Sequence, residues 1–564
     1  MTWDLVVRGG LVVDGTGRPA RTADVAVRAG RIAGVGRVDG PARREIDAGG
    51  LVVAPGFIDV HTHYDAQLAW DPLATPSSWH GVTTVLTGNC GFTLAPAKPD
   101  DVGWLAQMLS RVEGMSAEAL AAGLGWRGGG FGDYWGRLAG RIAVNAGGYV
   151  GHSAVRRFVM GDDASVRAAR PDEIDAMRAL VRAAMREGAL GFSSSQLDIH
   201  VAHDGREVPS NHAAPEELVA LAGVLAEFDA GALEFIARSF VTGWDARDRA
   251  LLRAMVQASG KPIEVHTLTP LVAAPTGWLE ALEYARAAQA DGVRIHPMFP
   301  TNKLGAHFAL DSTFVFDEFP SFRAALTLPP GARERALRDP AVRDRMRREL
   351  AEPEGRAFVF AWEIVFVESV ANPAHAGWVG RTVAELAVER GQDPLDCLLD
   401  LALADGLATS FLVEAPAGSG IEYVVETLLR EPFVMAGSSD GGAHLMTFVG
   451  ADYTTRLLTE WVPHVLSLEA AVAKLTSVPA GVHGLRGRGV LRAGAAADLV
   501  LWDPTRLAVG ATRLAADFPA GSRRYVVDAA GYVALVVNGE VVLQDGVPTG
   551  ACPGQVLRPE AGGA

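Results

Sequence analysis

The sequence predicts an α/β protein: a (β/α)8 barrel with a small β-rich domain built from both chain ends. Two observations predict this class. The middle of the chain alternates short apolar segments, which end in polar residues, with longer stretches of helical periodicity. Both ends instead alternate short apolar runs with glycine-rich turns, as antiparallel strands do. At 564 residues, 49% of them hydrophobic, the chain can bury a large core and hold more than one domain.

The predicted β-rich domain combines residues 1–55 with residues 486–564. The first range contains the runs LVVRGGLVVDG, DVAVRAGRIAGVG and EIDAGGLVVAPG, and the second contains ADLVLWDP and YVALVVNGEVVLQDG. Close spacing of apolar runs and glycine turns is typical of hairpins. Because the two ranges share this pattern, we expect them to form one β-sandwich.

The predicted barrel spans residues 56–485. Its helical stretches are illustrated by PDEIDAMRALVRAAMREG (171–188) and PEELVALAGVLAEF (215–228), in which apolar residues recur every three or four positions. Eight segments qualify as core strands, the number that closes such a barrel. They are 56–63, 83–90, 142–152, 188–195, 231–238, 261–267, 292–297 and 433–440.

An insertion of about 301–370 interrupts the repeat between the seventh and eighth strands. It contains the charged segment PPGARERALRDPAVRDRMRREL, which has the composition of a solvated helix face. Because it follows the carboxyl end of a barrel strand, we expect it to act as a lid over the active site.

Composition excludes several classes of protein. The net charge is −15 and no basic block occurs, so no nucleic-acid partner is expected. No run of 18 uncharged apolar residues occurs, so we expect no membrane span. The three cysteines, Cys90, Cys397 and Cys552, are too widely separated to suggest a disulfide framework, and the start MTWDLVVRGG has the pattern of a strand rather than of a leader. A cytoplasmic location follows as the expectation.

Polar residues at the strand ends predict the reactive site, because the carboxyl ends of barrel strands meet at one face. The first strand ends in His61-Thr62-His63, where the two-residue period directs both imidazoles into the barrel mouth. The second strand ends at Cys90, the sixth at His266 and the eighth at Asp440. Imidazole, thiolate and carboxylate are the ligands that zinc prefers, although polar residues at a barrel rim need not bind metal.

Motifs along most of the chain resemble the amidohydrolase superfamily, and within it the N-acyl-D-amino-acid deacylases (D-aminoacylases). The motifs are PGFIDVHTHYDAQ, GVTTVLTGNCGF, VEGMSAEALAAGLGW, GYVGHSAVR, GALGFSSS, GRTVAELAVERGQDP, VMAGSSDGGAH, TSVPAGVHGLRGRGVLRAGAAADLVLWDP and VVNGEVVLQDG. The resemblance implies a TIM-like metallo-dependent hydrolase barrel carrying a small β-sandwich. It also implies metal ligands at His61, His63, Cys90, His266 and Asp440.

Cys90, by this resemblance, is a thiolate able to bridge two metal positions. Many superfamily members use a carbamylated lysine of the fourth strand as the bridge, but the segment GALGFSSS has no lysine. A bridge, if there is one, must then be Cys90, which argues against a urease-like, dihydroorotase-like or hydantoinase-like site.

One position departs from the family. The deacylases carry another metal histidine at the end of the fifth strand, where this chain has Ile236. Either one ion is bound, with His266 as a weaker ligand or a substrate contact, or Glu234 replaces the missing ligand. We favour one tightly bound zinc, leave a second ion open, and expect Glu234 to support the site or contact substrate; the alternative is a buried Glu234 paired with Arg238. Mn, Fe, Co and Cu also suit such ligands.

Further residues are candidates for substrate contact. His152 ends the third strand at a family position, His296 ends the seventh, and His444 follows Asp440 by four residues. His200, His203 and His212 lie in a long loop after the fourth strand, where exposed histidines are also common. An N-acyl amino acid carries a carboxylate, for which Arg238 and Arg156 are the first candidates.

The expected chemistry is hydrolysis of the amide of an N-acyl-D-amino acid or a similar small substrate by metal-activated water, with Asp440 as general base and then general acid. The preference for D over L rests on the resemblance alone. Three alternatives stay open: a cyclic amidase or deaminase on the same scaffold, a non-catalytic ligand-binding descendant, and a metal-free enzyme with Cys90 as nucleophile. The expected partner is a small-molecule substrate, and homo-oligomerisation is left open.

Overall fold

A computed structural model gives the fold of residues 2–270, 274–301, 305–311, 313, 315–352, 360–413 and 420–559. Its centre is an eight-stranded parallel sheet in which all eight predicted segments contribute one strand each. In chain order these are β6 (Phe57–Asp59), β7 (Val82–Thr87), β8 (Asn145–Gly151), β9 (Gly191–Ser195), β10 (Ala232–Ile236), β11 (Ile263–His266), β12 (Ile295–Pro300) and β16 (Met435–Gly437).

The sheet is ordered β16-β12-β11-β10-β9-β8-β7-β6, so each strand pairs with its predecessor. Its two ends meet just past the strands, where Thr62 forms a parallel bridge with Gly441. The N–H of Thr62 also donates to the carbonyl of Leu86, and that of His63 to the carbonyl of Gly441. The predicted (β/α)8 barrel is therefore confirmed.

The barrel helices form where the sequence places apolar residues on one face. α5 (Pro171–Glu187) begins with proline, and the Glu173 carboxylate accepts from the N–H of Arg170, which satisfies a donor at the helix start. Its buried face is Met177, Val181, Ala184 and Met185, and the left-handed Gly188 ends it. The other helices of the barrel region are α1 (Val102–Val112), α2 (Ala117–Gly123), α3 (Phe131–Gly136), α4 (His152–Met160), α6 (Pro215–Gly223), α7 (Ala246–Ser259), α8 (Gly277–Ala290), α14 (Ile421–Arg430), α15 (Tyr453–Glu460), α16 (Leu468–Leu475) and α17 (Ser477–Val482).

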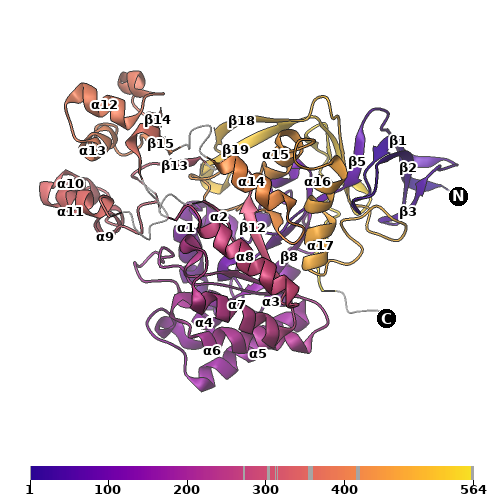
Figure 1. Ribbon diagram of the computed structural model, residues 1–564, viewed down its shortest axis with the longest axis horizontal. Coiled ribbons are helices and arrows are strands. Elements are labelled where there is room, and N and C mark those ends of the chain that lie inside the picture. The colour runs from indigo at the N-terminus through magenta and orange to yellow at the C-terminus, as the bar shows by residue number, and fades with distance from the viewer. Residues whose placement is uncertain are drawn as a thin grey trace.

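Both chain ends contribute to one nine-stranded sheet (Figure 1). Its strands are β1 (Trp3–Val12), β2 (Arg21–Arg28), β3 (Arg31–Gly36), β4 (Ala42–Asp47), β5 (Val52–Pro55), β17 (Leu499–Trp502), β20 (Tyr532–Val537), β21 (Glu540–Gln544) and β22 (Val547–Pro548), and β18 (Ala508–Ala515) pairs separately with β19 (Arg524–Ala530). The ends join where β5 and β17 run antiparallel. Alternate residues face opposite sides: Val500 and Trp502 pack into the barrel core, whereas Leu499 and Leu501 pack into the sheet's own core.

A helical excursion separates β12 from α14 and lies well apart from β1, β2 and β3 (Figure 1). It contains β13 (Ala306–Phe308), α9 (Pro320–Leu326), α10 (Ala332–Arg338), α11 (Pro340–Leu350), β14 (Val365–Ser369), α12 (Val383–Arg390), α13 (Pro394–Ala404) and β15 (Ser410–Val413). A three-stranded sheet and a separate hydrophobic cluster that includes Phe316, Leu398 and Phe411 unite these elements, several of which follow residue 370. Within the predicted insertion, 302–304, 312, 314 and 353–359 lie outside the described residues. The domain boundaries and the lid role stay predictions.

Candidate metal centre

The two histidines of the His-Thr-His segment lie directly beyond β6, where barrel closure fixes their position. The Thr62–Gly441 bridge holds the backbone between them against the segment that follows β16. The hydroxyl of Ser439 donates to the carbonyl of His61 across the same junction. The side chains that follow the first and eighth strands therefore lie close together, because these two strands are joined where the barrel closes.

Cys90 is positioned by a tight turn after β7. Its backbone is in the left-handed region (φ 58°), and its N–H donates to Oε2 of Glu234 over 2.8 Å. The side-chain amide of neighbouring Asn89 donates to the carbonyls of Val60 and Thr62. This turn therefore ties Cys90 both to the histidine segment and to β10, where Glu234 lies.

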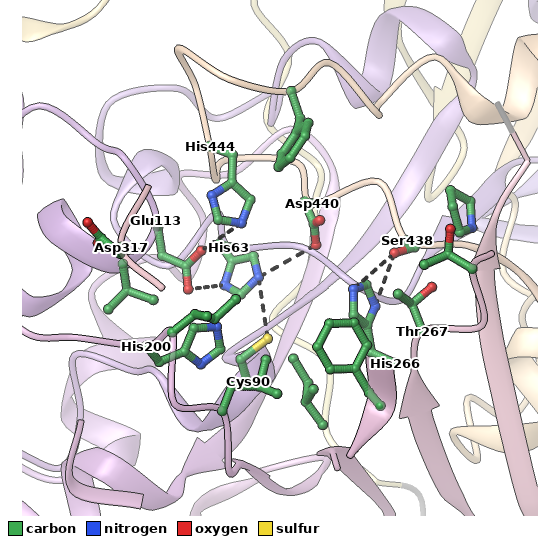
Figure 2. A pocket seen from close by; sticks show the side chains of 18 of the residues that line it. His63, Cys90, Glu113, His200, His266, Thr267, Asp317, Ser438, Asp440 and His444 are labelled. Atoms are coloured by element: carbon green, nitrogen blue, oxygen red, sulfur yellow. Dashed lines mark hydrogen bonds and ion pairs between the residues drawn. The ribbon is translucent and has the colours of Figure 1, made fainter. Parts of the chain in front are cut away.

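Four potential ligand atoms converge at this point. Sγ of Cys90 lies 3.6 Å from Nε2 of His61 and 3.9 Å from Nε2 of His63. Oδ1 of Asp440 lies 3.4 Å and 3.9 Å from the same two nitrogens. A tetrahedral zinc ion bound at 2.0–2.3 Å would separate such ligand atoms by about 3.3–3.6 Å. Figure 2 shows His63 between Cys90, Asp440 and Glu113.

A buried carboxylate lies behind each of these two histidines. Oε1 of Glu264 is 3.3 Å from Nδ1 of His61, and Oε1 of Glu113 is 3.2 Å from Nδ1 of His63. The contact of Glu264 is a hydrogen bond, which a carboxylate accepts only from a protonated Nδ1, so the Nε2 lone pair of His61 is left for a metal; Glu113 lies within ion-pair distance of His63. Glu264 also lies 3.2 Å from Nε2 of His483, so the network continues away from the cavity.

The charges of this cluster are unbalanced. Burial raises the pKa of Asp440 to about 6 and that of Glu234 to about 8. Burial disfavours the charged form of His61, but Glu264 and Asp440 outweigh it and raise its pKa to about 9. Among the described residues, no lysine or arginine forms an ion pair with Glu113, Glu234, Glu264 or Asp440. So many buried carboxylates call for a cation, which fits a bound metal ion.

The thiol of Cys90 is not activated as a nucleophile. Burial, reinforced by the carboxylate of Glu234, raises its pKa well above the ordinary value for cysteine. Reactive cysteines instead have lowered pKa values beside cationic groups. This environment suits a thiolate that is stabilised by a metal ion.

His266 lies close to the four atoms but has another partner. Its ring stacks on that of His61 with 4.2 Å between centroids, and a ligand atom of His266 lies within 4.8 Å of ligand atoms of His61 and Asp440. Both of its nitrogens face the hydroxyl of Ser438, at 3.0 and 3.3 Å (Figure 2). Ile236, which pairs with His266 in the register of β10 and β11, lines the cavity at the position where the resemblance expects a histidine.

The cluster opens into a cavity of about 250 Å³. His63, Cys90, His266, Asp440 and His444 lie in its wall, and His200 joins them from the loop after β9. Much of the remaining wall is apolar and includes Leu197, Ile199, Val201, Ile236, Phe240 and Phe448. A space of this size and character fits a small molecule with an apolar group.

Several predicted contacts lie elsewhere. His152 and Arg156 are fully buried and both bind Glu217, at 2.8 and 2.6 Å, so neither is available to a substrate. Arg238 and His203 are exposed. His212 and His296 are half-buried, and neither lines the cavity; Nδ1 of His296 contacts the carbonyl of Phe433. Glu234 contacts the backbone of Cys90 and is fully buried, as a supporting residue would be.

The structure also brings to the site residues that no sequence pattern had indicated. They are Glu113, Glu264, His483, Ser438, Arg111 and Asp317. Glu113 lies in the segment VEGMSAEALAAGLGW and directly follows the apolar face of α1. An acidic residue at the end of a buried helix face was the feature of the sequence that could have identified it.

Comparison with known proteins places this site in a family. The sequence model of the amidohydrolase family matches residues 44–340 and 355–543. D-aminoacylase of Alcaligenes xylosoxydans xylosoxydans is 31% identical over 574 residues, which cover 98% of this chain and 97% of that protein. N-acyl-D-glutamate deacylase of the same organism is 30% identical, with 99% and 97% covered.

A solved structure agrees with the sequence relatives. The N-acyl-D-glutamate deacylase from Bordetella bronchiseptica, complexed with zinc and a phosphonate mimic of the tetrahedral intermediate, aligns with a TM-score of 0.67 and 27% identity, covering 99% of this chain and 100% of that one. Among the described residues, no helix is both long and apolar enough to span a bilayer. The chain therefore belongs to the amidohydrolase family, together with D-aminoacylase and the N-acyl-D-amino-acid deacylases.

Proposed function

We propose that this protein is a metal-dependent hydrolase that cleaves the amide of N-acyl-D-amino acids. The observation that carries the proposal is that Sγ of Cys90 and Oδ1 of Asp440 each lie 3.4 to 3.9 Å from Nε2 of both His61 and His63, close to the ligand separations of a tetrahedral site. The relatives of similar length that cleave such substrates support the choice of bond and stereochemistry.

The four residues would hold one zinc ion, and the imbalance of buried negative charge around them supports a divalent cation. A zinc ion bound there lowers the pKa of water and polarises a carbonyl. His266, whose nitrogens face Ser438, is a weaker ligand or a substrate contact. Ile236 offers no atom that can bind a metal, so a second metal position would have fewer protein ligands than the first. This supports one tightly bound ion.

Asp440 is placed to move the protons of the reaction. It accepts a proton from the attacking water and donates one to the leaving amine nitrogen, so that water and amide yield a carboxylic acid and an amine. Its side chain is 17% exposed and lines the cavity, whereas the carboxylates behind the histidines are nearly inaccessible. Among these acidic groups, Asp440 is therefore the most accessible to substrate.

The apolar wall of the cavity indicates a substrate with an apolar side chain or acyl group. A cytoplasmic location and homo-oligomerisation stay predictions. The three cysteines form no disulfide with one another, which supports a reducing compartment.

Amine release from paired enantiomers tests the proposal. Zinc-loaded enzyme should release leucine from N-acetyl-D-leucine and much less from the L enantiomer. Asp440→Asn should lower kcat by about 10²-fold or more, because it removes the proton acceptor. Asp528→Asn, a change at a half-exposed surface carboxylate, should leave kcat as it is.

The other outcomes select other functions. Turnover of a cyclic imide, with no release from either N-acetyl-leucine, would assign the protein to cyclic amidases. Protein that binds no zinc and hydrolyses none of these substrates would support a non-catalytic ligand-binding descendant.

A further inference from the structure

A substrate of the proposed kind carries a carboxylate two bonds from the scissile nitrogen, and a cation should bind it. This inference therefore rests on the proposed function. The arginines expected for this role do not reach the cavity: Arg156 is paired with Glu217, and Arg238 is exposed. Among the described residues that line the cavity, Arg111 is the only lysine or arginine.

Arg111 lies in the last turn of α1, two residues before Glu113, and its side chain is 19% exposed. Its Nη1 donates to the carbonyl of Thr313 over 3.0 Å, and its Nη2 pairs with Oδ1 of Asp317. Its Nε is buried and has no hydrogen-bond partner among the described residues. The guanidinium is thus only partly satisfied.

The geometry of a guanidinium explains why this matters. Its Nε–H and one Nη–H lie along one edge and bind a carboxylate through two parallel hydrogen bonds. Asp317 uses only the Nη2 end of Arg111, which leaves the Nε donor of a nearly buried arginine unused. A buried donor without a partner is unfavourable, so a ligand that supplies an acceptor gains from it.

Asp317 is a nearly buried counter-ion of Arg111. Its side chain is 2% exposed, and burial raises the pKa of its carboxyl to about 6 although Arg111 opposes the shift. Removal of a carboxylate from water is costly unless it is fully paired. Asp317 and Thr313 both belong to the excursion between β13 and α9, so this contact joins the excursion to the barrel at the cavity wall. Figure 2 shows Asp317 on the same side of the cavity as Glu113.

We propose that Arg111 binds the α-carboxylate of the substrate, and that Asp317 is its counter-ion in the ligand-free enzyme. The excursion then forms part of the substrate site rather than only covering it. Since the described lining offers one arginine and a largely apolar wall, the substrate class is an N-acyl amino acid with a single carboxylate and an apolar side chain.

A pair of substrates that differ only in charge tests the assignment: N-acetyl-D-leucine and its carboxamide, with acetate release as the readout. Wild-type enzyme should prefer the acid, mainly through KM. Arg111→Gln should reduce the ratio of kcat/KM values (acid over carboxamide) by about 10- to 100-fold, the effect of losing a charged hydrogen-bonded pair. Arg111→Lys should restore part of the ratio, and Arg238→Gln, which removes an exposed arginine, should not change it.

A second variant covers the case in which Arg111→Gln does not fold. Asp317→Asn removes the competing carboxylate, so KM for the acid should fall while KM for the carboxamide stays constant. A purely structural role, in which the pair only docks the excursion, would change both substrates alike. An unchanged acid-to-carboxamide ratio in Arg111→Gln, or equal KM shifts in Asp317→Asn, overturns the proposal.

Direct binding separates this proposal from the proposed function. Calorimetric titration of Asp440→Asn protein compares the affinity for the acid and the carboxamide without turnover. If wild-type enzyme releases no acetate from either compound, deacylation is wrong. The ratio of the Kd values for the carboxamide and the acid still decides whether Arg111 selects the carboxylate. This ratio should be lost in the Arg111→Gln, Asp440→Asn double variant.

Discussion

Oε1 of Glu113 lies 3.2 Å from Nδ1 of His63, on the opposite side of the ring from Cys90 and Asp440. The imidazole is therefore held between a carboxylate and the ligand cluster. A carboxylate in this position restrains the orientation of a ligand histidine. The affinity of the site for metal then depends on residues that do not contact the ion.

Glu113→Gln should weaken zinc binding by about tenfold, because a neutral amide attracts the His63 imidazole less strongly than a carboxylate does. Competition with a chromophoric chelator measures the zinc Kd. Glu118→Gln, a change at an exposed glutamate of α2, is the matched control. Equal zinc affinity of Glu113→Gln and wild type would contradict a supporting role for Glu113.

Zinc should protect Cys90 from alkylation. Cys90 lines the cavity, whereas Cys552 is exposed and distant in sequence, so iodoacetamide should modify Cys552 at the same rate with and without zinc. Cys90 should react only in chelator-treated protein, and more slowly than Cys552, because its thiol pKa is raised. Peptide mass spectrometry follows both sites. Faster alkylation of Cys90 than of Cys552 in the metal-free protein would favour the nucleophile hypothesis instead.

Ile236→His should convert a one-zinc protein into a two-zinc protein. The position lies opposite His266 in the register of β10 and β11 and lines the cavity, so an imidazole there adds a donor beside His266 and Asp440. Zinc per chain, measured by mass spectrometry of the metal after gel filtration, should rise from one to two. Ile236→Leu keeps the size without a donor and should stay at one. A wild-type value of two would show that the missing histidine does not limit metal binding.

Glu173→Gln should lower stability at neutral pH by about 1 kcal/mol, because the carboxylate pairs with Arg167 and accepts the N–H of Arg170 at the start of α5. These contacts, with Arg167 the largest cause, lower the pKa of Glu173 to about 2. Its stabilisation is therefore complete above pH 4.5 and is lost as pH falls towards 2. Solvent screens the partly exposed arginine, so the effect is modest.

The gap between the urea midpoints of wild type and Glu173→Gln should narrow from pH 7 to pH 3.5. Glu216→Gln, at an exposed first-turn position of α6, is the matched control. A gap that stays constant over this range would mean that the Glu173 carboxylate does not titrate as described.

The barrel could be predicted because its signals are local. Each strand segment is apolar and ends in polar residues, as the stretch from Val82 to Cys90 illustrates, and α5 carries its own start and stop signals in Pro171 and Gly188. The two ends of the chain could be assigned to β-structure for the same reason. The extent of the excursion was harder, because its unity comes from packing between distant helices such as α9 and α13 rather than from a repeated pattern.

The ligand cluster could be proposed once the strand ends were taken together, but its surroundings could not. Arg156 and His152 were predicted from the sequence to contact substrate, but the fold pairs both with the buried Glu217 of α6. Arg111 looked like an ordinary charged residue in a helix, and its place in the cavity depends on Asp317 from a segment about 200 residues later. Such pairs depend on tertiary packing, which leaves no periodic trace in either segment.

The bridge between Thr62 and Gly441 has a consequence for protein synthesis. A nascent chain on the ribosome carries His61, His63 and Cys90 early, but it lacks Asp440 and the closing strand until more than three quarters of the chain has been made. Barrel closure and completion of the site are therefore one event, late in translation. A truncated product that ends before this junction retains three of the four ligand side chains but lacks Asp440 and the strand that closes the barrel.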